Sequence, residues 1–278
     1  MKIADELIES AQRIAQVIEL PEIEAIILPN PGSAQLHDAE FAAVCLRDGS
    51  MGFFYTLLDD TMQRLHSEID VDTWLGRSPL GLAQQYAAGD PLARSMGLGA
   101  INAITQSLFQ HVGYMPDTRT NSMAKMAFSQ DDHVGMVGYF PPLVERLRAR
   151  GVRLSVIEKK PELTQESDRF RVTLDAAELR ACNKILCTAA TLLNDSLDEI
   201  LGHCAHAQRV ALIGPTAGCL PDPLFARGVD AVGGSRVANP ALLKARLRDQ
   251  LEWAEAVEKY TIERDVYPGF EELLVRAR

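Results

Sequence analysis

The sequence lacks the paired ligands that mark common metal sites. It contains no CxxC or HxxxH pair, and its five cysteines, at positions 45, 182, 187, 204 and 219, are an odd number in a chain of 278 residues. Because zinc needs four ligands at characteristic spacing, we expect no tight structural zinc. The opening segment MKIADELIES also lacks the apolar region of a signal peptide. Free thiols in a reducing, cytoplasmic compartment are therefore predicted.

Long apolar runs and basic patches are absent as well. No run approaches the ~20 apolar residues of a membrane span, so no membrane partner is expected. The chain has 28 Lys and Arg against 38 Asp and Glu, a net charge of −10. Because duplex affinity comes largely from neutralising phosphates, we expect no nucleic-acid partner either. The expected partner is a small-molecule ligand, and a homo-oligomer is compatible with this composition.

The pattern of elements changes near residue 112. The first part reads as a helix at 3–18, a strand at 22–28, a β-hairpin at 41–57 and helices that begin at Pro79 and Pro91. This order is typical of an α+β unit. Two glycines inside the last helix, Gly97 and Gly99, are predicted to permit close packing of the backbone. We predict a small domain over 1–112 and a polar, aperiodic linker over 113–131.

Strands and helices alternate in the rest of the chain. Strands are predicted at 133–138, 152–158, 170–174, 184–188, 209–214 and 229–232, and helices at 141–150, 195–203 and 239–259. Alternation of this kind indicates βαβ units around a parallel sheet. The predicted fold class is therefore α/β, with a parallel-sheet domain over 132–278.

In such sheets ligands bind beyond the carboxyl ends of the strands. The residues there form the candidate ligand-binding set: Gly135, Gly138, Glu158, Thr188, Thr191, Gly214, Pro215 and Gly234, with Asn194 after the third core strand. The helix after Gly138 is expected to offer unpaired N–H groups to an anion. Glu158 lies twenty residues beyond Gly138, the approximate offset at which a carboxylate holds ribose hydroxyls.

Each candidate also has a purely structural alternative. The glycines can serve close strand–helix packing, and Glu158 can be a solvated turn residue paired with Lys159 and Lys160. Asn194 can be a helix N-cap. Cys219 is the best-placed thiol, but a free cysteine is most often a small apolar residue of the core. We assign no metal ligand, and the sequence names no cofactor.

Four blocks of the second half resemble a known family. They read VGMVGYFPPLVERL, LSVIEKKP, ILCTAATLLND and LIGPTAGCLPDPLFARGVDAVGG, and they resemble the bacterial and archaeal family called the putative heavy-metal chelation domain over about residues 130–240. The upstream DPLARSMGLGAINAI looks like the small domain that precedes it. The resemblance implies an enolase N-terminal-like α+β domain followed by a Rossmann-like domain, with a ligand site in the cleft between them. It adds Arg94 and Asn102 of the small domain to the candidate residues.

Two functions follow as hypotheses. The first is an enzyme that binds a small anionic or heterocyclic metabolite of metallophore, pterin or related synthesis. Asn194 and Asn102 would orient the reacting group, which makes them the catalytic candidates. The second is a non-catalytic binder of a metal ion or metal complex. Since no nucleophile or base stands out, the sequence names no reaction.

Overall fold

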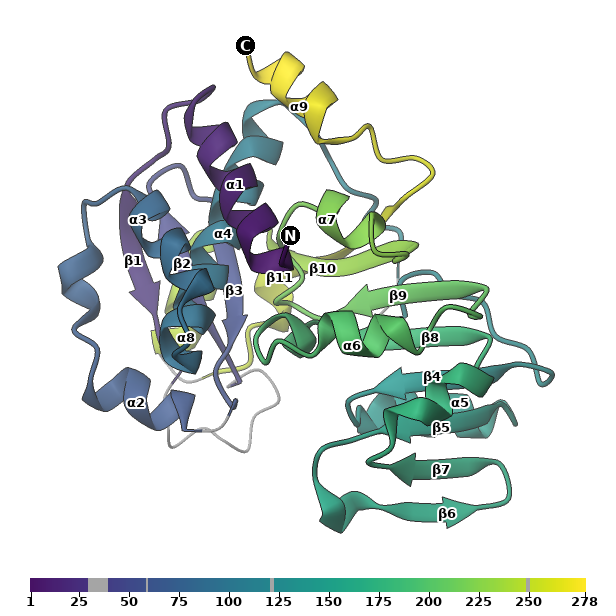
Figure 1. Ribbon diagram of the computed structural model, residues 1–278. Helices are drawn as coiled ribbons and strands as arrows, with labels where there is room; N and C mark the ends of the chain where they lie inside the picture. The colour runs from purple at the N-terminus through teal and green to yellow at the C-terminus, as the bar shows by residue number, and fades with distance from the viewer. Residues whose placement is uncertain (30–39, 59, 121–122, 249–250) are drawn as a thin grey trace.

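The computed structural model describes residues 1–278 except 30–39, 59, 121–122 and 249–250. Figure 1 shows two sheets: a small one on the left, and a larger one that extends from the centre to the lower right. The arrowheads of β4, β7 and β9 point toward the side on which the small sheet lies (Figure 1). The carboxyl ends of the parallel strands therefore face the small sheet.

The small sheet has three antiparallel strands in the order β1-β2-β3. Their bounds are Ile23–Ile27, Phe41–Leu46 and Met51–Tyr55. The predicted hairpin is confirmed: Gly49 has the positive φ that the turn requires, and the carboxylate of Asp48 accepts a hydrogen bond from Ser50 N.

Helix α4 (Pro91–His111) packs directly on this sheet. A Cβ at Gly52 of β3 would collide with the carbonyl oxygen of Gly99, and one at Gly97 would collide with the backbone of Tyr86. The expectation that Gly97 and Gly99 serve close packing is thereby confirmed. The N-cap signal of α4 is confirmed too, since the side chain of Asp90 accepts a hydrogen bond from Ala93 N.

The remaining elements of this part pack around α4 and β1. They are α1 (Ile3–Ala15), α2 (Thr61–Ser67), α3 (Pro79–Ala83) and the 3-10 turns Val71–Trp74 and Gln84–Ala87. The enolase N-terminal-like character of this part stays a prediction.

The large sheet has eight strands in the order β11-β10-β9-β8-β4-β5-β7-β6. Their bounds are β4 His133–Val137, β5 Arg153–Ile157, β6 Gln165–Ser167, β7 Phe170–Thr173, β8 Lys184–Thr188, β9 Arg209–Ile213, β10 Ala231–Val237 and β11 Val257–Glu263. The six strands from β10 to β7 are parallel, and β6 and β11 are antiparallel edge strands. The predicted α/β class with a mostly parallel sheet is confirmed.

The chain starts the sheet at β4 and then builds outward in both directions. Strands β5 and β7 follow on one side of β4, and β8, β9 and β10 follow on the other. The direction of building therefore reverses between β4 and β8, which makes this pair the topological switch point.

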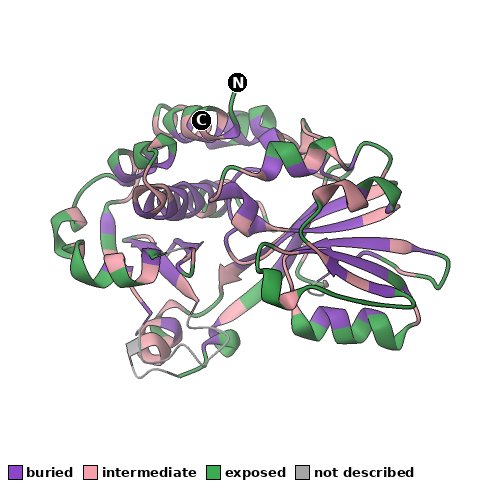
Figure 2. Cartoon of the chain, turned by 60° about the horizontal axis from the view of Figure 1, so that its bottom comes forward, coloured by how far each residue is buried: buried purple, intermediate pink, exposed green. Residues whose placement is uncertain are grey.

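Helices and turns connect these strands. They are α5 (Pro141–Ala149), α6 (Leu197–Gly202), α7 (Asp222–Phe225), α8 (Pro240–Arg248), α9 (Phe270–Ala277) and the 3-10 turns at 161–163, 176–181, 189–192 and 254–256. In Figure 2 the strands are mostly buried, whereas the peripheral helices show exposed faces. None of the described helices combines the length and the hydropathy that crossing a bilayer requires.

The helix predicted over 239–259 is wrong in its second half. Helix α8 ends at Arg248, residues 249–250 lie outside the described part, and the antiparallel strand β11 begins at Val257. Between them, the Trp253 ring stacks on Phe53 of β3 at 4.9 Å. A contact with the small sheet and pairing with β10 thus replace the helix that leucine spacing predicted.

Part of the segment predicted as a linker packs on the large sheet. Met123, Ala124 and Met126 are buried, and Asp117 forms an antiparallel bridge with Thr261 of β11. The domain bounds 1–112 and 132–278 stay a prediction.

Candidate functional site

The switch point between β4 and β8 is built from a glycine and a threonine. Gly138 follows β4 with φ of 88°, and a Cβ there would lie 3.3 Å from Cγ2 of Thr188. The left-handed φ disfavours other residues. Without a side chain at Gly138, Thr188 stays half-buried rather than covered.

Glu158 lies at the carboxyl end of the neighbouring strand β5. Its Oε2 accepts a hydrogen bond from Tyr139 N at 3.0 Å, and its Oε1 accepts one from Lys159 N at 2.7 Å. No lysine or arginine of the described residues forms an ion pair with it, so the expected alternative of pairing with Lys159 or Lys160 side chains is not what holds this carboxylate. Two backbone donors orient a half-exposed carboxylate.

The small sheet reaches this same edge through Tyr55, the last residue of β3. Burial raises the pKa of Tyr55 to about 12, and the negative charges of Glu40 and Glu158 add to the rise. The carboxylates of Glu158 and Glu40 therefore both disfavour ionisation of this phenol.

The hydroxyl residues after β8 mostly bond within their own turn. Thr188 Oγ1 accepts a hydrogen bond from Ala190 N at 3.2 Å, and Thr191 Oγ1 donates to Thr188 O at 2.7 Å. Asn194 Oδ1 accepts hydrogen bonds from the amide and hydroxyl of Ser196. The alternative of a helix N-cap is wrong for Asn194, because the N-cap of α6 is Ser196 and Asn194 bonds to that residue.

Arg94 of α4 contacts the segment that follows Thr191. Its guanidinium donates to Leu193 O at 3.4 Å and to Ala88 O at 3.5 Å, and it lies 3.6 Å from a carboxylate oxygen of Asp195. This side chain joins the small unit to the loop after β8.

Asn102 of α4 joins the same two parts at a fully buried position. Its Nδ2 donates to Phe53 O and to Thr216 O, both at 2.8 Å. Its Oδ1 has no hydrogen-bond partner among the described residues. Thr216 belongs to the loop after β9 that begins with Gly214 and Pro215, both half-buried. Both amide hydrogens of Asn102 hold backbone carbonyls, so this side chain positions that loop.

Two glycines of the predicted set lie inside strands. Gly135 is in the middle of β4, where a Cβ would meet the side chains of Leu179 and Ile185. Gly234 is in the middle of β10, where a Cβ would meet the ring of Tyr260. The structure brings Gly138, Glu158, Thr188 and Gly214 to strand ends at one edge, and these two glycines pack within the sheet.

The N-terminus of α5 offers less to an anion than expected. Its first two residues, Pro141 and Pro142, have no N–H group. The next two N–H groups, of Leu143 and Val144, both bond to Phe140 O at 2.9 Å. The expectation of unpaired donors at this helix is wrong, because proline and the carbonyl of Phe140 remove them all.

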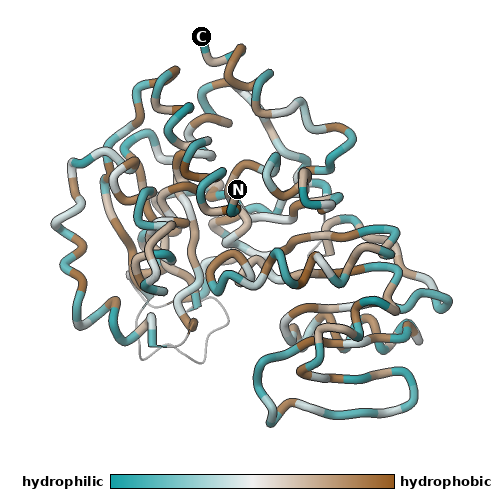
Figure 3. The backbone as a smooth tube through the Cα atoms, viewed as in Figure 1, coloured by the Kyte–Doolittle hydropathy of each residue, from teal (hydrophilic) through white to brown (hydrophobic). Residues whose placement is uncertain are grey.

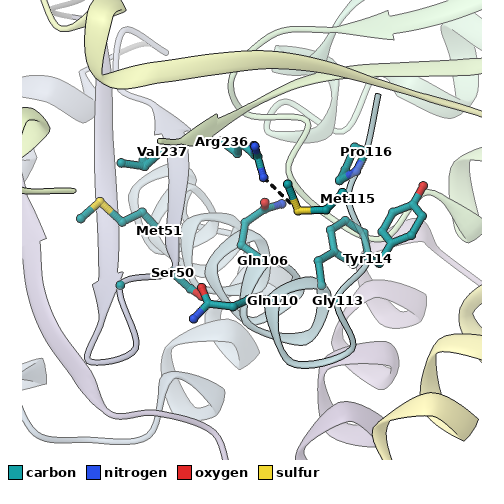
Figure 4. A pocket seen from close by; sticks show the side chains of 12 residues that line it. Ser50, Met51, Gln106, Gln110, Gly113, Tyr114, Met115, Pro116, Arg236 and Val237 are labelled. Carbon is teal, nitrogen blue, oxygen red and sulfur yellow. Dashed lines mark hydrogen bonds between the residues drawn. The ribbon is translucent and has the colours of Figure 1, made fainter. Parts of the chain in front are cut away.

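The structure has a cavity of about 200 Å³ farther along the sheet edge, which sequence reasoning missed (Figure 4). It lies between the hairpin turn, the end of α4 and β10, and its lining residues are Gly49, Ser50, Met51, Gln106, Phe109, Gln110, Gly113, Tyr114, Met115, Pro116, Arg236 and Val237. Arg236 binds Glu258 and donates to Met115 Sδ at 3.2 Å, and Gln106 donates to Gly218 O at 3.2 Å. Since these residues come from four separate segments, no local motif could reveal them.

The five thiols are poor ligands as folded. All are buried, and burial raises the pKa of Cys204 to about 11 and those of Cys45, Cys182, Cys187 and Cys219 to about 12. They are therefore protonated at neutral pH, whereas metals bind thiolates. In the described part of the chain, no three His, Cys, Asp or Glu side chains gather in a way that could hold a metal ion.

Comparison with known proteins gives two matching family models, both described as "Putative heavy-metal chelation". DUF364 matches residues 122–261 and DUF4213 matches residues 39–105. The uncharacterized protein MJ0500 of Methanocaldococcus jannaschii is 28% identical over 183 residues, which cover 63% of this chain and 67% of that protein.

Two solved structures of DUF364 proteins of unknown function have the same fold. The protein from Desulfitobacterium hafniense matches with a TM-score of 0.67 and 22% identity over 92% of this chain and 97% of its own. The protein from Pyrococcus horikoshii matches with a TM-score of 0.67 and 20% identity over 92% of this chain and 99% of its own.

Proposed function

Since the chain belongs to the DUF364 family described as "Putative heavy-metal chelation", we propose that it contributes to metal chelation by binding a small, hydroxyl-bearing heterocyclic metabolite. The ligand would bind at the carboxyl edge of the large sheet, beside the β4–β8 switch point, where the small sheet meets it. The protein would act on or deliver an organic molecule, and that molecule or its product would hold the metal.

The observation that carries the proposal is the state of Glu158. Its carboxylate is half-exposed, it is oriented by Tyr139 N and Lys159 N, and no cation of the described residues neutralises it. A carboxylate has about four acceptor sites, so roughly two remain for ligand hydroxyls. Its position also fits a general pattern, because open α/β sheets bind ligands at the switch point.

The order of the parallel strands supports the same location. Numbered by their order in the chain, the six strands from β7 to β10 follow the sequence 3-2-1-4-5-6, which is the order of Rossmann-like dinucleotide-binding sheets. In that arrangement the carboxylate after the second strand binds the ribose. Glu158 occupies this place.

Direct chelation by the protein is the alternative, and the buried thiols weigh against it. Binding a metal through these cysteines would require the core to open and protonated thiols to ionise. Carboxylates at the sheet edge could still receive a metal that arrives with an organic ligand.

Thermal shift and titration calorimetry test the proposal. The probes are a ribonucleoside, a polyol-bearing pterin, citrate, and Ni²⁺ or Zn²⁺ alone. A hydroxyl-bearing heterocycle should stabilise the protein by about 2.7 kcal/mol at a hundred times its dissociation constant, which is several degrees of melting temperature at roughly 2–4 °C per kcal/mol. Glu158→Gln should weaken that binding about ten- to a hundredfold.

Glu162→Gln is the matched control, because Glu162 is exposed in the turn that follows β5. Its binding should equal that of the wild type. Stoichiometric binding of Ni²⁺ or Zn²⁺ alone, unaffected by Glu158→Gln and without any organic ligand, would favour the chelating alternative.

A further inference from the structure

The geometry of the β4–α5 turn narrows the ligand class. We infer that the metabolite bound beside Glu158 is a ribonucleoside that carries no phosphate group. The inference rests on the proposed function, because it assumes that Glu158 faces the ligand.

The carboxylate of Glu158 favours a ribose as the sugar of the ligand. Each oxygen of Glu158 already accepts one backbone hydrogen bond, from Tyr139 N and from Lys159 N. Each oxygen therefore keeps about one acceptor site. Two adjacent acceptors held in a fixed orientation match the two neighbouring hydroxyls of a ribose.

The start of α5 argues against a phosphate group on the ligand. In dinucleotide-binding sheets of this strand order, the pyrophosphate sits on the N–H groups at the start of the helix after the first strand. Here Pro141 and Pro142 have no N–H, and the N–H groups of Leu143 and Val144 both bond to Phe140 O. A phosphate at this helix would find no backbone donor and would lose its water.

The charge around the edge works in the same direction. No lysine or arginine of the described residues pairs with Glu158, so a phosphate beside it would meet an unneutralised carboxylate. The nearest cations along the chain, Lys159 and Lys160, are exposed and lie on the solvent side of the turn. A neutral or cationic ligand is favoured over an anionic one.

We infer that the base stacks on an aromatic side chain of these strand ends. Tyr139 and Phe140 follow Gly138 directly, Tyr55 comes from the small sheet, and all three are half-buried. Partly exposed rings are suited to stack on a planar heterocycle. Sugar, charge and aromatic surface together describe a nucleoside.

The test is a calorimetric comparison of adenosine, 2′-deoxyadenosine, AMP and NAD on the full-length protein. Adenosine should bind at least tenfold more tightly than AMP and NAD. Removing the 2′-hydroxyl should cost about tenfold, and Glu158→Gln should abolish the preference for adenosine over 2′-deoxyadenosine. Guanosine and inosine repeat the series with other purines.

A gain-of-function variant tests the role of the prolines. The double variant Pro141→Ala, Pro142→Ala restores two N–H groups at exposed positions. It should reduce the difference in affinity between adenosine and AMP by tenfold or more. Pro161→Ala is the control, since Pro161 also opens a turn but lies after β5. In this control variant the difference in affinity between adenosine and AMP should equal that of the wild type.

The possible outcomes distinguish a failure of this inference from a failure of the proposed function. If AMP or NAD binds as tightly as adenosine, or if a pterin polyol binds through Glu158 and no nucleoside does, the inference fails and the proposed site stands. If no hydroxyl-bearing ligand responds to Glu158→Gln, both fail.

Discussion

Two carboxylates at opposite edges of the same sheet are held in opposite ways. At the amino edge, Asp132 is buried and accepts hydrogen bonds from Lys184 Nζ and Asn183 Nδ2, both at 2.8 Å, and from Ser129 N at 2.6 Å. At the carboxyl edge, Glu158 is half-exposed, and among the described residues it accepts hydrogen bonds only from Tyr139 N and Lys159 N. The acceptor sites of Asp132 are occupied by donors of the folded chain, whereas Glu158 keeps acceptor sites open.

The difference extends along the two edges. The amino edge carries further ion pairs, between Arg209 and Glu263 at 2.9 Å and between Arg264 and Asp230 at 2.6 Å. The switch-point end of the carboxyl edge carries Gly138 and Thr188 instead. An ion pair between Arg236 and Glu258 also joins β10 to β11 at the carboxyl edge, so the contrast holds for the switch-point end of that edge.

The largest effect should come from Asp132→Ala. It leaves Lys184, Asn183 and Ser129 N without their shared acceptor, and breaking a buried pair costs about 3 kcal/mol or more. Urea denaturation measures the loss. Asp131→Ala, at the exposed neighbouring position, should change the free energy of unfolding by less than about 0.5 kcal/mol. Equal losses in both variants would remove the contrast between the edges.

Acid should produce the next largest effect. Burial acts to raise the pKa of Asp132, but the donors of Lys184, Ser129 and Asn183 outweigh it and lower the pKa from 3.8 to about 2. Because the folded pKa is the lower one, this stabilisation is present above pH 4 and is lost as the pH falls from about 4 to 2. It amounts to about 2 kcal/mol.

The difference in stability between the wild type and Asp132→Asn, measured from pH 6 to pH 2, reports this term. It should shrink by that amount over the acid range. A constant difference would mean that the carboxylate is not the source.

A smaller effect is expected from Gly138→Ala. The left-handed φ costs about 1 kcal/mol with a side chain present, and the new Cβ would press on Thr188 Cγ2 at 3.3 Å. Gly228→Ala isolates the backbone contribution, because Gly228 has φ of 89° and no heavy atom within 4 Å of its Cβ position. Thermal unfolding should show a slightly larger loss at Gly138. A larger loss at Gly228 would contradict the close approach.

The smallest change in stability should come from Glu158→Gln. The amide oxygen can keep one backbone hydrogen bond, and no ion pair is broken, so the free energy of unfolding should change by less than about 0.5 kcal/mol. Denaturation alongside Asp132→Ala measures both edges in one experiment. A loss above about 2 kcal/mol would make Glu158 a structural residue like Asp132.

Local signals in the sequence predicted much of this fold. Asp48-Gly49 placed the hairpin turn, and Asp90 before Pro91 placed the start of α4, because both features act through bonds to residues two or three positions away. Glu158 was placed at a strand end by the apolar run that precedes it. The pair Pro141-Pro142 was an equally local signal of lost N–H donors at α5, and the expectation of unpaired donors overlooked it.

Features that depend on distant contacts could not be predicted. Leu243, Leu247 and Leu251 have helical spacing, yet the chain leaves the helix, and Trp253 stacks on Phe53, two hundred residues earlier. Gly135 looked like part of a ligand loop, but Leu179 and Ile185 decide its role by packing over β4. The cavity beside Arg236 is likewise assembled from segments far apart in the chain.

The outermost strand, β6, bears on how the protein behaves at high concentration. Its three residues, Gln165, Glu166 and Ser167, are all exposed, and the strand is hydrophilic along its length (Figure 3). Unpaired strand edges attract other chains, and a short, charged edge offers them little to extend. At the opposite border, Asp117 bridges to β11 and covers part of that edge. We expect neither border to act as a template for aggregation.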